Sequence, residues 1–507
     1  MNQHFNLADW IVIFAYLGGI IALGMWFGKD QHNVRDYFLG SKNTPWWGIG
    51  LSIVAAETSA LTIIGVPGLA FGGNIALLQM IIGYVIARII LAVVMVPHYL
   101  KGEIYSPYQL LADKFGPGAR QTAGGFFLLS ETLAAGVRVY VVCIPIQLAL
   151  GISVLPAIVL FVLLSLIYSY IGGVKAVIWT DAVQFGLFLA GGLFTLFYIP
   201  SLTDGGWTAV MNKAAEAGKL HWLNTAFSLG APINIWMGVL GGTVLVMSSH
   251  GAEQLIVQRV LACKNVADGR KALVLSAVLI FPLFLVFLLV GAMLWVFYQS
   301  HAIAIPIPEH TDMKKDDFVY PIFMLSEVPH VLRGFLIVAI LSAAMSSVSS
   351  ALTSLASVST MDFARKLLGE RSEEYHLRFS KLSMVFWGVA LAGVALLSSK
   401  VRSVYDTAFS LRGLTSGALL GGVLLAVFMR RGRSLPVVVG MMAALIVMTG
   451  IEVFPKWSVT QGTWFKVVGT QIIWPWYTLI GVTVMLTVTW LTRALIGDKG
   501  SESQSQG

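Results

Sequence analysis

Residues 341–362 read LSAAMSSVSSALTSLASVSTMD and lie at the end of a strongly apolar run that begins near Gly334. Ser346, Ser349 and Ser350 are separated by three and four positions, so in a helix they share one side. Close packing between membrane helices explains such small residues, because they let backbones approach and serine can bond to its own helix. Ion binding is a second explanation, because a hard cation needs several oxygen ligands. The spacing alone leaves both explanations open.

The composition of the whole chain is that of a membrane protein. Its 507 residues are 57% hydrophobic and 11% charged, and the mean hydropathy is +0.80, whereas about 25% of residues in soluble domains are charged. Apolar runs near the roughly 20 residues that cross a bilayer as a helix recur along the chain. We therefore expect an all-α polytopic membrane protein. The first run follows a segment without Lys or Arg, which favours a retained helix over a cleaved signal peptide.

The loops between these runs predict the orientation. If the N-terminus lies outside, most Lys and Arg of the loops fall on the cytoplasmic side, including Arg259 in the expected loop 251–270. The positive-inside rule then predicts the N-terminus outside and the C-terminus inside. This explains the net charge of +8 without a nucleic-acid partner. Thirteen spans are expected, near 9–27, 45–70, 74–99, 122–150, 153–171, 177–199, 232–250, 271–298, 331–361, 379–398, 406–429, 434–454 and 473–492.

Several ionisable residues lie within these spans, where facing lipid would be costly. Such residues usually face a bundle interior and mark a pathway, and a structural ion pair between helices is the alternative for each of them. Glu131 and Arg138 are seven residues apart and share a helix face, so they are expected to pair with each other or with Glu57. The residues concerned are Glu57, Arg88, Glu131, Arg138, Asp181 and Arg412.

Glu57 belongs to SIVAAETSALTIIGVPG, residues 52–68, in which small and hydroxyl residues precede Gly-Val-Pro-Gly. Proline removes a backbone donor and glycine loosens a helix, so we expect a break or kink. A broken membrane helix exposes carbonyls that bind cations where it lines a protein cavity. A kink without a function is the alternative.

Several stretches together resemble the sodium/solute symporter family, which includes sodium/glucose, proline, pantothenate and sialic acid transporters. The stretches are DYFLGSKNTPWW (36–47), SIVAAETSALTIIGVPG (52–68), GGVKAVIWTDAVQ (172–184), EQLIVQRVLACK (253–264) and the serine-rich segment through Met361–Asp362. The resemblance implies sodium-coupled symport of a small solute by alternating access, with sodium as the coupling ion and without another cofactor.

The resemblance also implies an order of parts along the chain. Two inverted five-helix repeats, each with a broken first helix, would occupy 45–199 and 232–429. The other parts would be a first transmembrane helix and cytoplasmic loop (1–44), an extracytoplasmic loop (200–231), two C-terminal helices (430–496) and a disordered tail (497–507).

The resemblance implies two sets of sodium ligands. A first site would use the carbonyls of Ala55, Thr58 and Ala343 with the hydroxyls of Ser346 and Ser347. A second site, present in some family members, would use Asp181, Ser346, Ser349 and Ser350. The alternative for Asp181 is a helix-cap carboxylate near the cytoplasmic face.

The resemblance also predicts a solute cavity and a preference for its solute. Family members that carry sugars have an aromatic pair where this chain has Ser249 and His250, so a polar or anionic solute is favoured over a neutral hexose. In sialic acid transporters an arginine near the place of Arg138 binds the substrate carboxylate; a lock formed by an ion pair is the alternative. The expected cavity residues are Glu57, Ser59, Thr62, Glu131, Arg138, Ser249, His250 and Arg412.

Other functions are alternatives to sodium symport. Proton coupling through Glu57 or Asp181 is one alternative. A solute-sensing receptor is another, but the tail after Leu491 is too short for a signalling module. The chain has no HExxH, GxSxG or metal-spaced Cys/His cluster, so we do not expect an enzyme. The expected partners are a small solute and lipid, without nucleic acid, in the plasma (inner) membrane; the sequence does not predict an oligomeric state.

Overall fold

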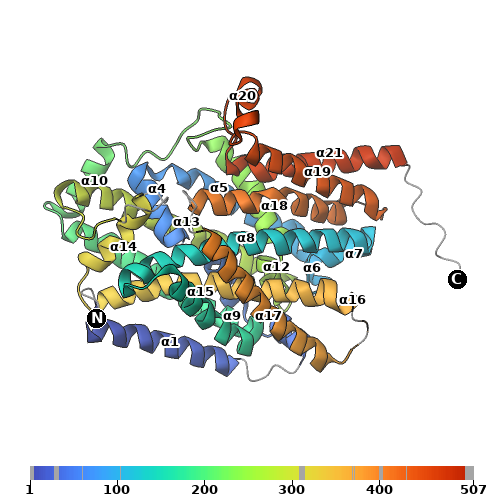
Figure 1. The fold of residues 1–507 in the computed structure, drawn as a ribbon, viewed down its shortest axis with the longest axis horizontal. Helices are drawn as coiled ribbons and strands as arrows, with labels where there is room; N and C mark the ends of the chain where they lie inside the picture. Colours follow the sequence, from blue (N-terminus) through green and yellow to red (C-terminus); the bar gives the residue numbers. More distant parts are fainter. Residues whose placement is uncertain are drawn as a thin grey trace.

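The protein folds as a bundle of helices. The computed structural model describes residues 5–27, 33–59, 61–102, 104–307, 315–367, 369, 371–398, 404–429 and 431–496. Every regular element in these ranges is a helix, which confirms the expected all-α class. The long helices run roughly along the longest axis of the molecule, and α1 (Leu7–Phe27) begins at the end opposite to the one where α21 (Tyr477–Ile496) finishes (Figure 1).

Most helices follow one another with short connections, whereas a long one joins α10 to η4. The elements of the first half are α2 (Val34–Leu39), η1 (Gly40–Lys42), α3 (Trp46–Glu57), η2 (Leu61–Gly65), α4 (Val66–Gly72), η3 (Ile75–Leu77), α5 (Leu78–Val94), α6 (Val96–Leu100), α7 (Tyr108–Phe115), α8 (Pro117–Leu150), α9 (Val154–Ser201) and α10 (Gly206–Glu216). The elements of the second half are η4 (Met237–Gly242), α11 (Thr243–Gly251), α12 (Gln254–Leu261), α13 (Val266–Ser300), α14 (Asp316–Ser326), α15 (Leu332–Val358), η5 (Ser359–Ala364), α16 (Arg365–Leu367), α17 (Glu373–Leu397), α18 (Val404–Phe428), α19 (Ser434–Val453), α20 (Ser458–Val467) and η7 (Trp474–Trp476).

Ten helices of the described chain are long and apolar enough to cross a bilayer, and the bent pair α3–α4 raises that number to eleven. Two further differences from the predicted thirteen are local. The expected spans 153–171 and 177–199 both lie in α9, whose 48 residues include Gly173 with φ 54° and ψ −160°. A straight helix of that length would measure roughly 70 Å, more than twice the roughly 30 Å of the hydrocarbon core. The expected span 232–250 corresponds to η4 and the short α11. The number thirteen therefore stays a prediction.

A helix break occurs near the start of each predicted repeat. The helix α3 ends at Glu57, Thr58 has extended dihedrals, and α3 and the following helical segment are bent by 63°. The helix α11 ends at Gly251, and Glu253 is extended before α12 begins. The expectation of interrupted helices at both places agrees with the observed backbone, whereas the inverted repeats themselves stay a prediction.

Close backbone packing holds the first break in place. A Cβ atom on Gly291 of α13 would lie 2.1 Å from the carbonyl oxygen of Pro67, in α4. Only glycine allows such an approach, so Gly291 lets α13 pack directly against the helix that follows the break.

The serine-rich helix α15 lies at the centre of the bundle. In the apolar 18-residue stretch of this helix, 94% of the residues are buried, whereas 17% are buried in the corresponding stretch of α1. The serines of α15 therefore face protein and not lipid, as either explanation of the serine-rich segment requires.

Candidate ion and solute sites

The hydroxyl of Ser347 connects α15 to the first helix break. Ser347 Oγ lies 3.4 Å from the carbonyl oxygen of Thr58 and 3.1 Å from that of Ala343. The Thr58 side chain is fully buried, and its Oγ1 has no hydrogen-bond partner among the described residues. Three of the five predicted ligands of the first site are therefore adjacent, beside an unpaired buried hydroxyl.

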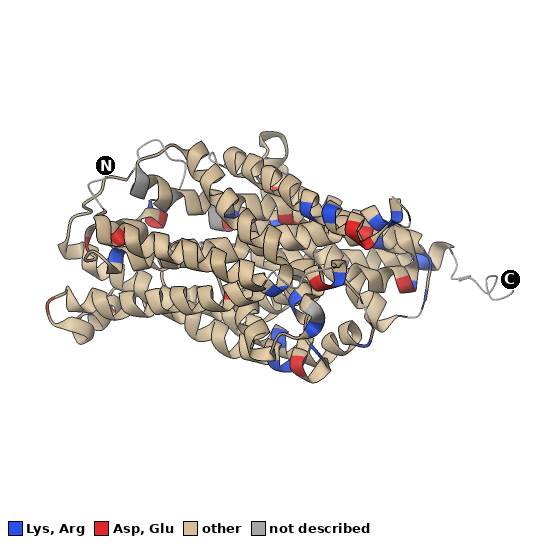
Figure 2. Cartoon of the chain, turned by 90° about the horizontal axis from the view of Figure 1, so that it is seen from below, with Lys and Arg blue, Asp and Glu red and all other residues tan. Residues whose placement is uncertain are grey.

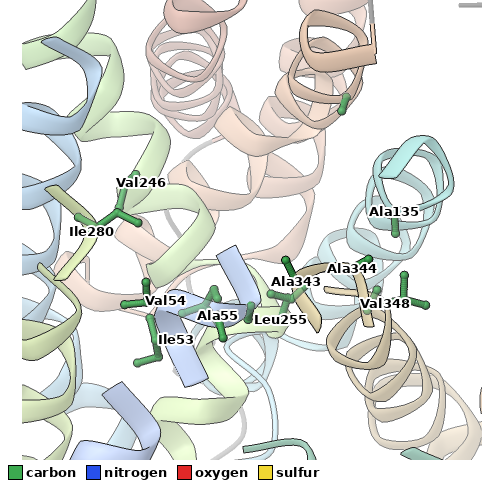
Figure 3. Packing of buried hydrophobic residues seen from close by; sticks show 14 of the residues in the cluster. Ile53, Val54, Ala55, Ala135, Val246, Leu255, Ile280, Ala343, Ala344 and Val348 are labelled. Atoms are coloured by element: carbon green, nitrogen blue, oxygen red, sulfur yellow. The ribbon is translucent and has the colours of Figure 1, made fainter. Parts of the chain in front are cut away.

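The Ala55 carbonyl belongs to the last turn of α3. A helix end leaves its last carbonyls without intrahelical partners. The N–H of Thr58 still bonds to the Val54 carbonyl at 2.9 Å, whereas the N–H of Ser59 donates to Thr62 Oγ1 at 3.4 Å. In Figure 3, Ala55 of α3 and Ala343 of α15 are drawn in the same part of the packed core, as is Leu255 of α12. We call Ala55, Thr58, Ala343 and Ser347 the first ion region.

Ser346 points away from the first ion region and toward Asp181. Its hydroxyl donates to Asp181 Oδ1 at 2.6 Å, and the hydroxyl of Ser52 donates to Asp181 Oδ2 at 2.5 Å. Asp181 lies eight residues beyond Gly173, inside α9, so it is not a helix cap. Ser349 donates to the Ser346 carbonyl of its own helix at 3.0 Å.

Arg259 is the residue of this cluster that sequence reasoning placed wrongly. It was expected in a cytoplasmic loop, but it lies in α12 and is only 2% exposed. Its Nη2 lies 2.8 Å from Asp181 Oδ2, and it also donates to Ser350. The hydroxyl of Ser350 in turn donates to the Ser346 carbonyl at 2.5 Å. We call Ser52, Asp181, Arg259, Ser346 and Ser350 the second ion region.

The sequence around Arg259 does not indicate that this arginine is buried. It occurs in EQLIVQRVLACK, which looks like the basic start of a loop after a span that ends at residue 250. After the break at Ala252–Glu253 the chain forms a second short helix, α12, whose residues are buried. That break is a polar and glycine-containing stretch, SSHGAEQ, and it is the signal that could have placed Arg259 inside the protein.

Seven of the eight predicted solute residues line one cavity. Glu131 is not among its lining residues and lies behind Arg138. The predicted residues that line it are Glu57, Ser59, Thr62, Arg138, Ser249, His250 and Arg412. The others are Ala56, Tyr84, Leu245, Val246, Leu255, Ile256, Phe284, Ala408 and Phe409.

Two arginines face this cavity with their carboxylate partners behind them. Arg138 Nη1 lies 3.2 Å from Glu131 Oε1, and Arg412 Nε lies 2.8 Å from Glu253 Oε2. The side chains of the arginines are 10% and 15% exposed, against 1% and 4% for the two glutamates. The expected pairing of Glu131 with Arg138 is confirmed. The pairing of Glu253 with Arg412 is not expected from the sequence.

The third ion pair has the opposite arrangement. Arg88 of α5 pairs with Glu57, and here the carboxylate faces the cavity, because the Arg88 side chain is fully buried and that of Glu57 is 14% exposed. Glu57 therefore pairs with Arg88 and not with Arg138. Each of the three pairs has a formal charge of zero. The cavity surface nevertheless presents two guanidinium groups and one carboxylate.

His250 joins the Glu57–Arg88 pair to the hydroxyl of Ser249. Its Nε2 lies 3.1 Å from Arg88 Nη2, and its Nδ1 lies 2.8 Å from Ser249 Oγ. A guanidinium only donates, so Nε2 accepts and the proton is assigned to Nδ1. A neutral imidazole therefore satisfies both contacts.

Comparisons with known proteins agree with this arrangement. A sequence model described as the sodium:solute symporter family matches residues 37–444. The sodium/sialic acid symporter SiaT of Proteus mirabilis (strain HI4320) is 29% identical over 88% of this chain and 90% of its own. The sodium/sialic acid symporter NanT of Aliivibrio fischeri (strain ATCC 700601 / ES114) is 27% identical over 97% of this chain and 94% of its own.

A solved structure has the same fold over almost the whole chain. It shows the substrate-bound outward-open state of a Na⁺-coupled sialic acid symporter, and its report describes a novel Na⁺ site. It matches with a TM-score of 0.85 and 25% identity, covering 97% of this chain and 99% of that one. The broken helices, the buried serine helix and these matches agree, and the chain belongs to the sodium:solute symporter family.

Proposed function

We propose that this protein is a symporter for a small solute that bears a carboxylate group. Its membership of a family of sodium-coupled transporters makes it a symporter that works by alternating access with sodium as the coupling ion. The solute is the part that the proposal adds.

The two arginines at the cavity surface carry the proposal. A guanidinium is always charged, and its planar fork matches the geometry of a carboxylate. Glu131 and Glu253 hold Arg138 and Arg412 from behind, so their remaining N–H groups can point toward a solute. Relatives of similar length are named for an acid, sialic acid, which supports the same chemistry.

The rest of the cavity suggests what else the solute carries. Glu57 only accepts hydrogen bonds, so the proposed solute presents hydroxyl, amide or ammonium donors toward it. Tyr84, Phe284 and Phe409 supply an apolar surface for its carbon skeleton. A polar acid with several donors fits this lining better than a neutral hexose.

The proposal includes two sodium ions per cycle, one at each ion region. It also includes thirteen spans in the plasma (inner) membrane, with the N-terminus outside and the C-terminus inside. Lys and Arg gather toward the end of the bundle where the C-terminus lies, with fewer at the end of the N-terminus, which supports this orientation (Figure 2).

A thermal-shift screen of the purified protein tests the solute. Small carboxylic acids are compared with their amides, each in sodium and in potassium, because a ligand that binds the folded state raises its melting temperature. We expect stabilisation by one or more acids that needs sodium and is lost with the matching amide. Stabilisation by neutral solutes and by no acid would contradict the proposal.

A further inference from the structure

The guanidinium of Arg259 is held on every side by acceptors from four helices. Its Nε donates to Ser52 Oγ of α3 at 2.8 Å, and its Nη1 donates to the Leu255 carbonyl of α12 at 2.5 Å. Its Nη2 reaches Asp181 Oδ2 of α9 at 2.8 Å and also Ser350 of α15. The side chain of Asp181 is fully buried and that of Arg259 is 3% exposed.

A buried carboxylate that stays ionised needs a cation beside it. An unpaired charge in a protein interior is strongly unfavourable, so while Asp181 is buried and ionised it needs a cation beside it, and otherwise it must take up a proton. In this structure the neutralising cation belongs to the protein itself, because Arg259 forms the ion pair with Asp181.

Two of the residues that bond to Arg259 are also proposed to hold the second sodium ion. Arg259 bonds to Asp181 and to Ser350, which are two of the four ligands expected from the sequence. Ser52 donates to Asp181 Oδ2 while its own oxygen accepts from Arg259, so the hydroxyl is also used by the guanidinium. A sodium ion within bonding distance of Asp181 Oδ2 would lie only a few ångströms from the guanidinium, where two positive charges repel strongly in a poorly polarisable interior.

We propose that Arg259 is a tethered cation that neutralises Asp181 whenever the second ion is absent, and that sodium and Arg259 exclude one another at Asp181. The inference rests on the proposed second sodium site and adds a residue that sets its affinity. Binding of the ion requires the guanidinium to leave Asp181 and Ser350, and release of the ion lets it return.

This exchange would connect ion binding to the broken helix of the second repeat. Arg259 lies on α12, directly after the break at Ala252–Glu253, whereas Ser52, Asp181 and Ser350 lie on three other helices. Displacing the guanidinium therefore breaks the hydrogen bonds that join α12 to Ser52, Asp181 and Ser350 on those three helices at the same time. A carboxylate neutralised by a fixed ion alone would lack this connection.

The alternative is a permanent structural lock, and direct binding of radioactive sodium distinguishes the two. The full chain is purified in sodium, exchanged into potassium and titrated with radioactive sodium as wild type, Arg259→Gln and Arg259→Lys. Glutamine keeps hydrogen-bonding groups but removes the competing charge. We expect two bound ions in the wild type and at least about tenfold tighter binding of the weaker ion in Arg259→Gln.

Lysine keeps the charge, so the affinity of Arg259→Lys for the weaker ion should stay closer to the wild type than that of Arg259→Gln. Should Arg259→Gln fail to give folded protein, Arg259→Lys still tests the inference. A single ammonium cannot reproduce the contacts to Ser52, Asp181 and Ser350 together, so binding of the weaker ion should tighten by about threefold.

Each contrary result has its own meaning. Two ions in the wild type with unchanged or weaker binding in the glutamine variant would overturn the inference and leave the two-ion proposal intact. A single ion in the wild type and in both Arg259 variants, lost in Ser347→Ala, would overturn the second sodium site and the inference with it.

Discussion

The two ion regions differ in the kind of oxygen that they offer. The first ion region consists of backbone carbonyls and the hydroxyl of Ser347, so it presents only neutral dipoles. The second ion region contains Asp181, a full charge that already has a positive partner in Arg259. Both regions use the same helix, α15, where Ser347 faces one of them and Ser346 the other.

This difference changes what happens when the ion leaves. Neutral groups can bond to one another, as Ser347 does with the Thr58 and Ala343 carbonyls, so an empty first region leaves no unpaired charge. A buried carboxylate that stays ionised has no such option and needs a replacement positive charge. A dipolar site can therefore simply empty, whereas a charged site needs an internal substitute for its ion.

The largest effect is expected on the charged side of the comparison. Asp181→Asn leaves Arg259 buried without a counter-charge, and breaking a buried pair in this way costs about 3–5 kcal/mol of folding free energy. The double variant Asp181→Asn/Arg259→Gln removes both charges and should recover most of that loss. Thermal unfolding of the purified proteins in potassium gives the measurement. Equal stability of the single and double variants would show that the pair is not essential when the site is empty.

In the first ion region, which is neutral, we expect a substitution to change folding less and to weaken sodium binding. Ser347→Ala removes one oxygen ligand, so sodium affinity at the first region should fall by about tenfold or more, which corresponds to about 1.4 kcal/mol. Ser354→Ala is the matched control, because Ser354 is buried on the same helix and donates only to the Ala351 carbonyl at 3.0 Å. Radioactive sodium binding compares the two. The same sodium dependence in both variants would remove the first region from the ion path.

Ser346 is the residue with which to sharpen the comparison. Its hydroxyl donates to Asp181, although the sequence placed it in both sodium sites. We expect Ser346→Ala to weaken the second bound ion more than the first, in a titration that resolves both. A larger loss at the first ion would mean that the hydroxyl turns toward Thr58 when sodium binds.

The solute cavity provides a further test of how a buried charge is used. Arg138→Lys keeps the ion pair with Glu131 but loses the planar fork, so the apparent affinity for a stabilising acid should fall roughly tenfold. Arg120→Lys is a matched control, because Arg120 Nε pairs with Asp362 at 2.5 Å and lies outside the lining of this cavity. Affinity is read from thermal shift against acid concentration. Near-normal affinity in Arg138→Lys would assign Arg138 to a structural lock.

The smallest expected effect concerns the sodium dependence of transport. Two coupled ions predict a Hill coefficient above one for the wild type, and removal of the second site in Asp181→Asn/Arg259→Gln should bring it toward one. Uptake of the identified acid into proteoliposomes over a range of sodium concentrations measures it. A hyperbolic curve in the wild type would leave transport with a single coupling ion.

Much of the fold could be predicted from the sequence because its signals are local. Apolar runs of bilayer length predicted helices, and the stretch 52–68 predicted a break, which lies at Thr58 and so before the Gly-Val-Pro-Gly. The crowding of serines on one face predicted that α15 would be buried against protein. The resemblance added Thr58 and Ala343 as partners of Ser347, and the structure brings these three residues together.

Partner choice among buried charges depended on the tertiary structure. The sequence allowed Glu57 to pair with Arg138, but helix packing brings it to Arg88 instead. Asp181 and Arg259 are 78 positions apart, and Arg412 and Glu253 are 159 apart, so no local pattern links them. A membrane sequence determines by itself that such charges must be paired, because lipid cannot solvate them. Which charges meet is decided only when the helices pack, because that packing sets every distance between them.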